Sequence, residues 1–137
     1  MSRVYLAVPI IENRNLNKAQ LLSKTIEDTG HMIVSVWVTK TDPGFTMTPQ
    51  GVFERDTQGV KECDILVAEV SDRSHGVGME MMLAHTQGKK VICLFKKGTV
   101  VSKMILGLPD ALLIEYGTEK EMVEKLKEIL EKLPFSH

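Results

Sequence analysis

Short, continuous apolar runs alternate with segments of helical period along the chain of 137 residues. Each run is too short for a helix and has no polar face, which is typical of a strand buried on both sides. Five such strands are predicted, over residues 4–10, 32–38, 65–70, 91–95 and 111–116. Because a helical segment follows each run, the pattern predicts a parallel sheet covered by helices on both faces.

Capping residues and turn residues mark the helices between these strands. Thr48 followed by Pro49 is typical of a helix start, and Thr118 begins a capping-box pattern. Gly51 and Gly59 weaken the helical pattern that follows Thr48. The predicted helices cover approximately residues 16–29, 49–63, 77–87, 100–106 and 118–133.

The order of elements predicts an α/β fold and a place for a site. We expect a single domain over residues 1–137, with a five-stranded parallel sheet that is flavodoxin- or Rossmann-like and has strand order 2-1-3-4-5. Ligands of such sheets bind beyond the carboxyl ends of the strands, where the strand order reverses. Two segments meet there: residues 9–15, PIIENRN, and residues 71–80, SDRSHGVGME.

The turn SHGVGME, residues 74–80, has the features of an anion site. Gly76 and Gly78 permit close approach of a ligand and positive φ, and a helix beginning near Val77 offers unpaired N–H groups. Ser74 adds a hydroxyl donor, so the turn can bind a phosphate. The spacing also fits a simpler interpretation, in which Glu80 only complements the helix dipole.

Further carboxylates lie on the helix that leads into the third strand. Asp56 and Glu54 can supply a carboxylate pair at the crevice, which suits cleavage of glycosidic bonds. The alternative for Glu54 and Arg55 is a solvated helix face. Tyr5, on the first strand, is either a core aromatic residue or part of the site.

Composition excludes several classes of function. The net charge of −1 and the scattered basic residues argue against a nucleic-acid polymer as partner, and no apolar run reaches the roughly 20 residues of a membrane span. We expect a soluble cytoplasmic protein with two reduced cysteines, Cys63 and Cys93. The four histidines show no metal-ligand spacing with these cysteines, so neither a metal nor a cofactor is expected.

A family resemblance is carried by residues 56–95, which read DTQGVKECDILVAEVSDRSHGVGMEMMLAHTQGKKVICLF. This segment resembles the signature of the nucleoside 2-deoxyribosyltransferase family. It is most similar to the 2′-deoxynucleoside 5′-phosphate N-hydrolase branch, in which the turn reads Ser-x-Gly-Val-Gly-x-Glu. A weaker similarity extends to Tyr5 and to residues 101–107, VSKMILG.

The resemblance implies three catalytic residues. Glu80 matches the nucleophile that attacks C1′ of the deoxyribose and forms a glycosyl-enzyme intermediate. Asp56 matches the acidic residue that contacts the sugar and assists proton transfer at the leaving base. Tyr5 matches a tyrosine that positions the nucleophile.

The resemblance also implies the substrate-binding residues and a homodimer. Ser74, Gly76 and Gly78 match the cradle of the 5′-phosphate. Apart from the resemblance, Ile10 is placed where it can pack on the base or sugar. Ser102 matches a serine that reaches the phosphate from the neighbouring subunit, with Met104 beside it at the site entrance.

The segment after the first strand departs from the family pattern. The hydrolase branch resembles GSIRGG there, and its serine and arginine help to hold the phosphate. In this chain Pro9 and Ile11 stand near those two positions, and Arg14 is the nearest candidate replacement. The need for a 5′-phosphate therefore stays open. The base preference also stays open, because the loop at residues 39–48 can close over a base.

Three functions are compatible with these features. The first hypothesis is hydrolysis of the N-glycosidic bond of 2′-deoxynucleoside 5′-monophosphates to free base and 2-deoxyribose 5-phosphate. The alternatives are a deoxyribosyltransferase that exchanges bases and a non-catalytic nucleotide-binding module. Retention of Tyr5, Asp56 and Glu80 together argues against the binding module.

Overall fold

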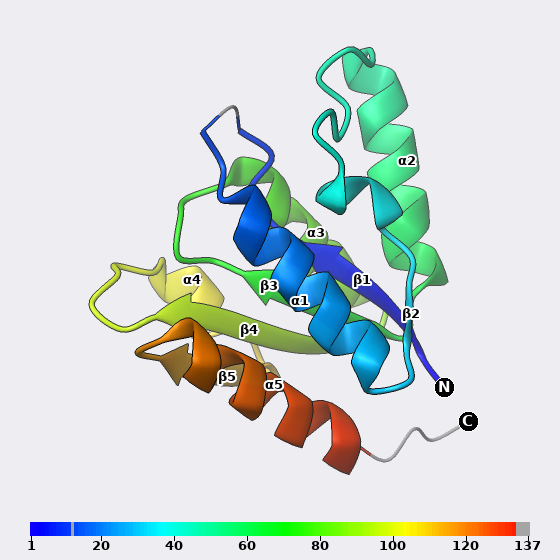
Figure 1. Ribbon diagram of the computed structural model, residues 1–137. Helices are drawn as coiled ribbons and strands as arrows, with labels where there is room; N and C mark the ends of the chain where they lie inside the picture. The colour runs from blue at the N-terminus through cyan, green and yellow to red at the C-terminus, as the bar shows by residue number, and fades with distance from the viewer. Residues whose placement is uncertain (12, 134–137) are drawn as a thin grey trace.

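The computed structural model describes residues 1–11 and 13–133, so Glu12 in the segment after the first strand lies outside the described residues. Its five strands form one parallel sheet in the order β2-β1-β3-β4-β5, which confirms the predicted α/β fold and strand order (Figure 1). The strands are β1 (Arg3–Ala7), β2 (Met32–Ile33), β3 (Ile65–Glu69), β4 (Lys90–Lys96) and β5 (Leu112–Tyr116).

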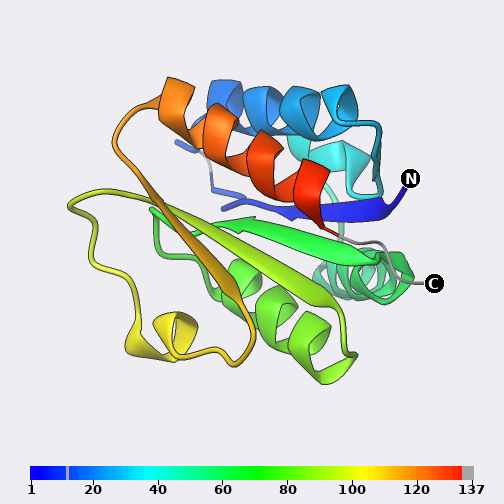
Figure 2. The ribbon, with the colours of Figure 1, turned by 90° about the horizontal axis from the view of Figure 1, so that it is seen from below.

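Helices cover both faces of the sheet. Figure 2 shows α1 (Leu16–Asp28) and α5 (Glu119–Lys132) on one face, and α2 (Pro49–Glu62), α3 (His75–Thr86) and α4 (Lys103–Leu106) on the other. Successive side chains of a strand point to opposite faces, which explains the unbroken apolar runs. On β1, Val4 and Leu6 join the core under α1 and α5, whereas Tyr5 and Ala7 join the core under α2 and α3.

The second strand is shorter than predicted, because a serine side chain replaces part of the ladder. The N–H of Val34 still donates to the carbonyl of Val4, at 2.8 Å. The buried Ser35 hydroxyl then accepts from the N–H of Leu6 at 2.8 Å and donates to its carbonyl at 2.9 Å. The chain turns into a short 3₁₀ helix, η1 (Val36–Thr39). The prediction of a strand over residues 32–38 is therefore wrong beyond Ile33.

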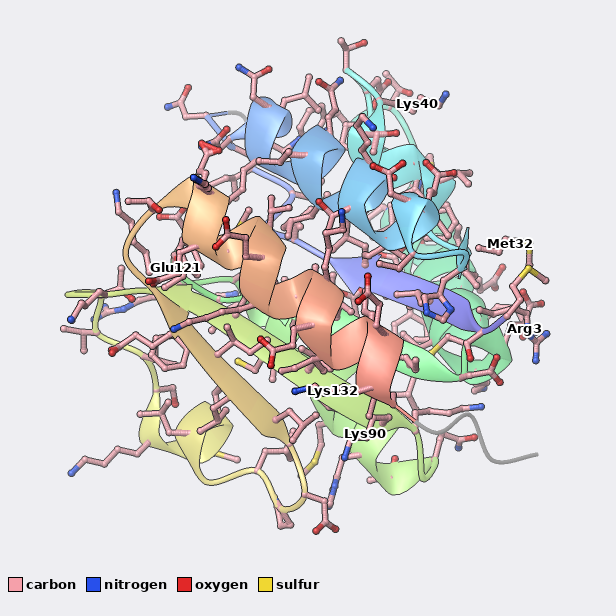
Figure 3. The ribbon with its side chains drawn as sticks, turned by 60° about the horizontal axis from the view of Figure 1, so that its bottom comes forward. Arg3, Met32, Lys40, Lys90, Glu121 and Lys132 are labelled. Carbon is pink, nitrogen blue, oxygen red and sulfur yellow. The ribbon has the colours of Figure 1, made fainter. Side chains whose placement is uncertain are left out.

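Other boundaries differ by a few residues, and the last helix follows its prediction. β1 ends at Ala7 rather than at residue 10, and the predicted helix 100–106 is only the turn α4, capped by Ser102. At α5, the Thr118 hydroxyl accepts from the N–H of Glu121 at 3.2 Å. Figure 3 shows Glu121 and Lys132 near opposite ends of this helix, where their charges complement its dipole.

Gly59, which weakens the predicted helix, is required by packing. A Cβ at this position of α2 would lie 2.9 Å from Cε2 of Tyr5 and 3.3 Å from the ring of Trp37. The helix can therefore lie against the Tyr5 ring only if residue 59 has no side chain. This close approach is one of the contacts that position Tyr5.

We expect Gly59→Ala to destabilise the protein by about 1–3 kcal/mol, because the overpacking at Tyr5 outweighs the gain in helix propensity. Gly78→Ala in α3 is the matched control, since a Cβ there meets no atom within 4 Å. The control should be neutral or stabilising by up to about 1 kcal/mol. Urea denaturation of both variants gives the comparison. Equal stability of the two would contradict the packing role of Gly59.

Candidate active site

Three predicted residues from separate elements meet on the α2–α3 side of the sheet, near the point where the strand order reverses. The Tyr5 hydroxyl, on β1, donates a hydrogen bond to a carboxylate oxygen of Glu80 on α3. Asp56 on α2 and Glu80 line one cavity of about 300 Å³. The Tyr5 side chain is buried, with 1% of its surface exposed, so it reaches Glu80 from the core. The predicted catalytic residues are therefore brought together.

The start of α3 lies two residues earlier than predicted. Ser74 is the N-cap, and its hydroxyl oxygen accepts from the N–H of Val77 at 3.2 Å, so α3 begins at His75. Gly76 and Gly78 lie inside the helix, and neither has the positive φ that the sequence suggested. What these glycines contribute is open space beside the helix. A Cβ at Gly76 would meet only the Ser74 hydroxyl, at 3.9 Å, and a Cβ at Gly78 would meet no atom within 4 Å.

The 300 Å³ cavity gathers three of the six predicted binding residues. Ser74 and Gly76 line it from α3, and Ile10 lines it from the segment after β1. A second cavity of about 570 Å³ also includes Asp56, Gly76 and Glu80, and it extends between the exposed side chains of Phe53 and Met79. The remaining residues of the first cavity are Val8, Pro43, Gly44, Phe45, Val52, Arg55 and Val77.

Three predicted residues lie elsewhere in the chain's own structure. Gly78, Ser102 and Met104 line a groove of about 870 Å³ formed by α3 and the α4 segment, and Ser74 also lines it. Ser102 caps α4, and 79% of the Met104 side chain is exposed. One chain therefore does not bring Ser102 or Met104 into the cavity that holds Glu80.

Burial controls the ionisation of the Tyr5–Glu80 pair. It raises the pKa of Glu80 to about 7, and the nearby charge of Asp56 adds to this effect, whereas the Tyr5 hydrogen bond and the Arg55 charge oppose it. Burial also raises the pKa of Tyr5 far above its usual range, with a further contribution from the Glu80 charge. Tyr5 is thus a neutral donor, and Glu80 exchanges its proton near neutral pH. A carboxyl pKa shifted in this way is typical of functional sites.

Arg55 is the charged residue of the cavity wall that sequence reasoning missed. Glu54 is exposed, as a solvated face requires, but the same interpretation is wrong for Arg55, whose side chain is only 20% exposed. Its Nε donates to Asp56 at 2.9 Å, and its guanidinium lies 4.3 Å from the centre of the Trp37 ring. The sequence carried no signal for this contact, because residues 32–38 were predicted to be a strand and Trp37 lies in η1.

Arg14 does not replace the missing arginine of the segment after β1. Its guanidinium donates to the carbonyl oxygens of Val38, at 2.6 Å, and of Lys40, so it holds the end of η1. Pro9 is buried, and Ile11 is 46% exposed. The cation on the wall of the 300 Å³ cavity is Arg55, from α2.

Residues 1–11 and 13–133 contain no group of three or more histidine, cysteine, aspartate or glutamate side chains placed to hold a metal ion. No helix in the described part of the chain has the length and apolar character needed to cross a membrane.

Cys63 and Cys93 are buried free thiols. Burial raises the pKa of Cys63 to about 11 and that of Cys93 to about 12. Both thiols therefore stay protonated at neutral pH and are poor nucleophiles.

The chain is similar to proteins named as nucleotide N-hydrolases. The chain is 37% identical over 135 residues to a Thermofilum pendens protein provisionally named 2′-deoxynucleoside 5′-phosphate N-hydrolase 1, covering 93% of this chain and 94% of that protein. It is 43% identical over 63 residues to the 5-hydroxymethyl-dUMP N-hydrolase of Mus musculus, covering 44% of this chain and 36% of that protein.

A solved structure gives the same result at the level of the fold. The CMP N-glycosidase of Clostridium botulinum superposes with a TM-score of 0.76 at 26% identity, over 93% of this chain and 98% of that one. Residues 4–127 match the family described as Nucleoside 2-deoxyribosyltransferase. The chain therefore belongs to the nucleoside 2-deoxyribosyltransferase family of enzymes.

Proposed function

We propose that the protein hydrolyses the N-glycosidic bond of 2′-deoxynucleoside 5′-monophosphates and releases free base and 2-deoxyribose 5-phosphate. The observation that supports this proposal most directly is the partly buried Tyr5–Glu80 hydrogen bond beside Asp56, at a cavity large enough for part of a nucleotide. The names of the related proteins support hydrolysis of nucleotide N-glycosidic bonds as the reaction class.

In this mechanism Glu80 is the nucleophile. Its carboxylate attacks C1′ as the bond to the base breaks, and the positive charge that develops at C1′ is stabilised by the same carboxylate. The absence of an electron-withdrawing 2′-hydroxyl makes that charge easier to form. Tyr5 holds the attacking group by its hydrogen bond, and Asp56 contacts the sugar and assists proton transfer to the base. Water then attacks C1′ and frees Glu80.

The start of α3 is the proposed site of the 5′-phosphate. The N–H groups in the first turn of a helix have no intrahelical acceptors and carry a partial positive charge. Gly76 adds no side chain that would keep an anion away, and Ser74 lines the same cavity. This supports a phosphate site built mainly from the backbone, although the segment after β1 supplies no arginine side chain to the cavity.

We further propose that two copies of the chain form the complete site. The groove between α3 and α4 is lined by the exposed apolar side chains of Met79, Met82 and Met104. A second copy seated there would cover these side chains. Because Ser74 lines both this groove and the cavity of Glu80, the partner's Ser102 would approach the phosphate.

The proposed reaction needs Glu80 as a carboxylate, and ionisation of this buried group destabilises the folded protein. The pKa of Glu80 is raised to about 7 in the folded protein, so the folded state binds a proton more tightly than the unfolded chain does. The contribution of this group to stability is complete below the unfolded pKa of about 4.3 and is lost as the pH rises through 7. At alkaline pH the folded protein therefore holds a carboxylate in an environment that disfavours its charge.

The catalytic proposal predicts release of free base from deoxynucleoside monophosphates, measured by chromatography against deoxynucleosides and ribonucleoside monophosphates. Glu80→Gln should reduce the rate by about a thousandfold or more, because it removes the nucleophile. Glu54→Gln, on the exposed face of α2, is the matched control and should retain full activity. Equal release by wild type and Glu80→Gln would refute the proposal. Faster base release when a second base is added would indicate a transferase. Nucleotide binding without any product would indicate a binding module.

The assembly proposal predicts a dimer in sedimentation equilibrium at micromolar concentration. Met82→Glu should give a monomer, because it places a charge in the apolar groove. Met32→Glu is the control, since Met32 is equally exposed but lies on β2 next to Arg3 (Figure 3). A monomeric wild type would exclude the proposed shared site.

The buried carboxylate predicts a pH-dependent gain in stability for Glu80→Gln. At pH 8 the variant should unfold with a free energy about 1–3 kcal/mol higher than that of wild type, because glutamine has no charge to bury. At pH 3.5 the difference should disappear, since Glu80 is then protonated in both the folded and the unfolded state. Urea denaturation at both pH values measures this. A difference that does not change with pH would rule out burial of the Glu80 charge as its cause.

A further inference from the structure

The guanidinium of Arg55 is a cation on the wall of the cavity that holds Glu80, and its role within the proposed function follows from its contacts. Nε donates to Asp56 at 2.9 Å, and the flat group stacks 4.3 Å from the centre of the Trp37 ring. Trp37 also packs edge-on against Tyr5, with ring centres 6.0 Å apart. Arg55 is thus fixed by the same side chains that position the catalytic pair.

The loop before α2 brings its backbone close to Arg55. Gly44 has φ +136°, and a Cβ there would lie 3.1 Å from Nη1 and 3.2 Å from Nη2 of Arg55. The Asp42 carboxylate holds this loop by accepting from the N–H groups of Gly44, at 2.9 Å, and Phe45, at 2.6 Å. Arg55 is therefore preorganised before any substrate binds, which is the condition for effective electrostatic stabilisation.

Most of the hydrogen-bonding capacity of Arg55 is unused. A guanidinium has five N–H donors. One of these donates to Asp56, and another faces the sulfur of Met47, which is 3.2 Å from Nη1 and a weak acceptor. Within residues 1–11 and 13–133 no other acceptor is bonded to this group, so three donors are free next to the cavity.

The neighbours of Arg55 in this cavity suit a nucleobase better than a phosphate. Val8, Ile10, Phe45 and Val52 give the cavity wall an apolar surface that can pack on a flat ring. The carboxylate of Asp56, bonded directly to Arg55, repels a phosphate dianion, and the start of α3 already offers N–H groups for that anion. N–H donors surrounded by apolar side chains suit a ligand oxygen that is neutral when it binds and becomes negative during the reaction.

We propose that Arg55 donates a hydrogen bond to the O2 oxygen of a pyrimidine base and stabilises the base as it departs. The bond between C1′ and N1 breaks and leaves its electron pair on the base, where the negative charge is shared between N1 and O2. A Glu80 oxygen forms the new bond to C1′. The base then takes up a proton from solvent, which Asp56 relays. Water later attacks C1′, the bond between C1′ and Glu80 breaks with its electron pair returning to the carboxylate, and the water proton leaves through Asp56 to solvent.

This role gives the site a preference among bases. In pyrimidines a carbonyl oxygen is attached beside the glycosidic nitrogen and gains charge as that bond breaks. In adenine no oxygen flanks the glycosidic nitrogen, so Arg55 has no equivalent group to stabilise. Pyrimidine deoxynucleotides are therefore expected to react faster than dAMP.

The test compares Arg55→Gln with wild type on dUMP and on 5-fluoro-dUMP, whose fluorine withdraws electrons and makes the base a better leaving group. Arg55→Gln should lower kcat/KM for dUMP about a hundredfold, and Arg55→Lys less, because it keeps the charge. The loss on 5-fluoro-dUMP should be about tenfold smaller, because that base needs less stabilisation. Glu54→Gln is the control and should change neither rate.

The outcomes separate this inference from the proposed function. An equal loss on the two substrates would show that Arg55 only shapes the site, and would overturn the inference. A loss confined to phosphorylated substrates, absent with deoxyuridine and 5-fluorodeoxyuridine, would assign Arg55 to the phosphate instead and also overturn it. A wild-type protein that releases no base from any of these compounds would refute the proposed function itself.

Discussion

The hydrogen bond from Tyr5 to Glu80 joins strand β1 to the helix that carries the proposed nucleophile, and the other features of the site depend on it. Tyr5 can make this bond only because α2 has a glycine at position 59 and because Trp37 packs against the Tyr5 ring. The bond is made by a hydroxyl that keeps its proton, since burial and the Glu80 charge raise the pKa of Tyr5. A neutral donor orients the carboxylate without neutralising it, which preserves its capacity to attack.

Charge around this bond is balanced only in part. Asp56 disfavours ionisation of Glu80, whereas Arg55 favours it, and burial outweighs both. The fold therefore stores an unfavourable interaction at the place where chemistry is proposed, a common compromise between stability and activity. The two apolar cores on either side of the sheet, both of which take alternate residues of β1, β3 and β4, stabilise the molecule enough to tolerate that interaction.

The layout of the sheet could be predicted from the sequence because buried parallel strands leave a distinct signal. Unbroken apolar runs alternate with capped helices, and the order 2-1-3-4-5 is a common arrangement of such units. That order placed Glu80 near the crevice, and the family resemblance supplied Tyr5 and Asp56, which the structure brings together. The predictions for residues 32–38 and for Arg55 were wrong because they depend on single side chains that contact other helices or strands. The Ser35 hydroxyl replaces main-chain pairing, and Arg55 depends on Trp37 and Gly44, contacts that no local period encodes.

The hydroxyl of Ser35 has one more consequence, which concerns solubility. An edge of a sheet exposes unpaired N–H and C=O groups that can recruit a strand from another molecule. Here β2 is only two residues long, and beyond it both backbone groups of Leu6 are occupied by Ser35. A foreign strand can find no free pairing position at Leu6 on this side of β1. A buried serine thus protects the sheet from edge-to-edge association at the point where its border strand ends.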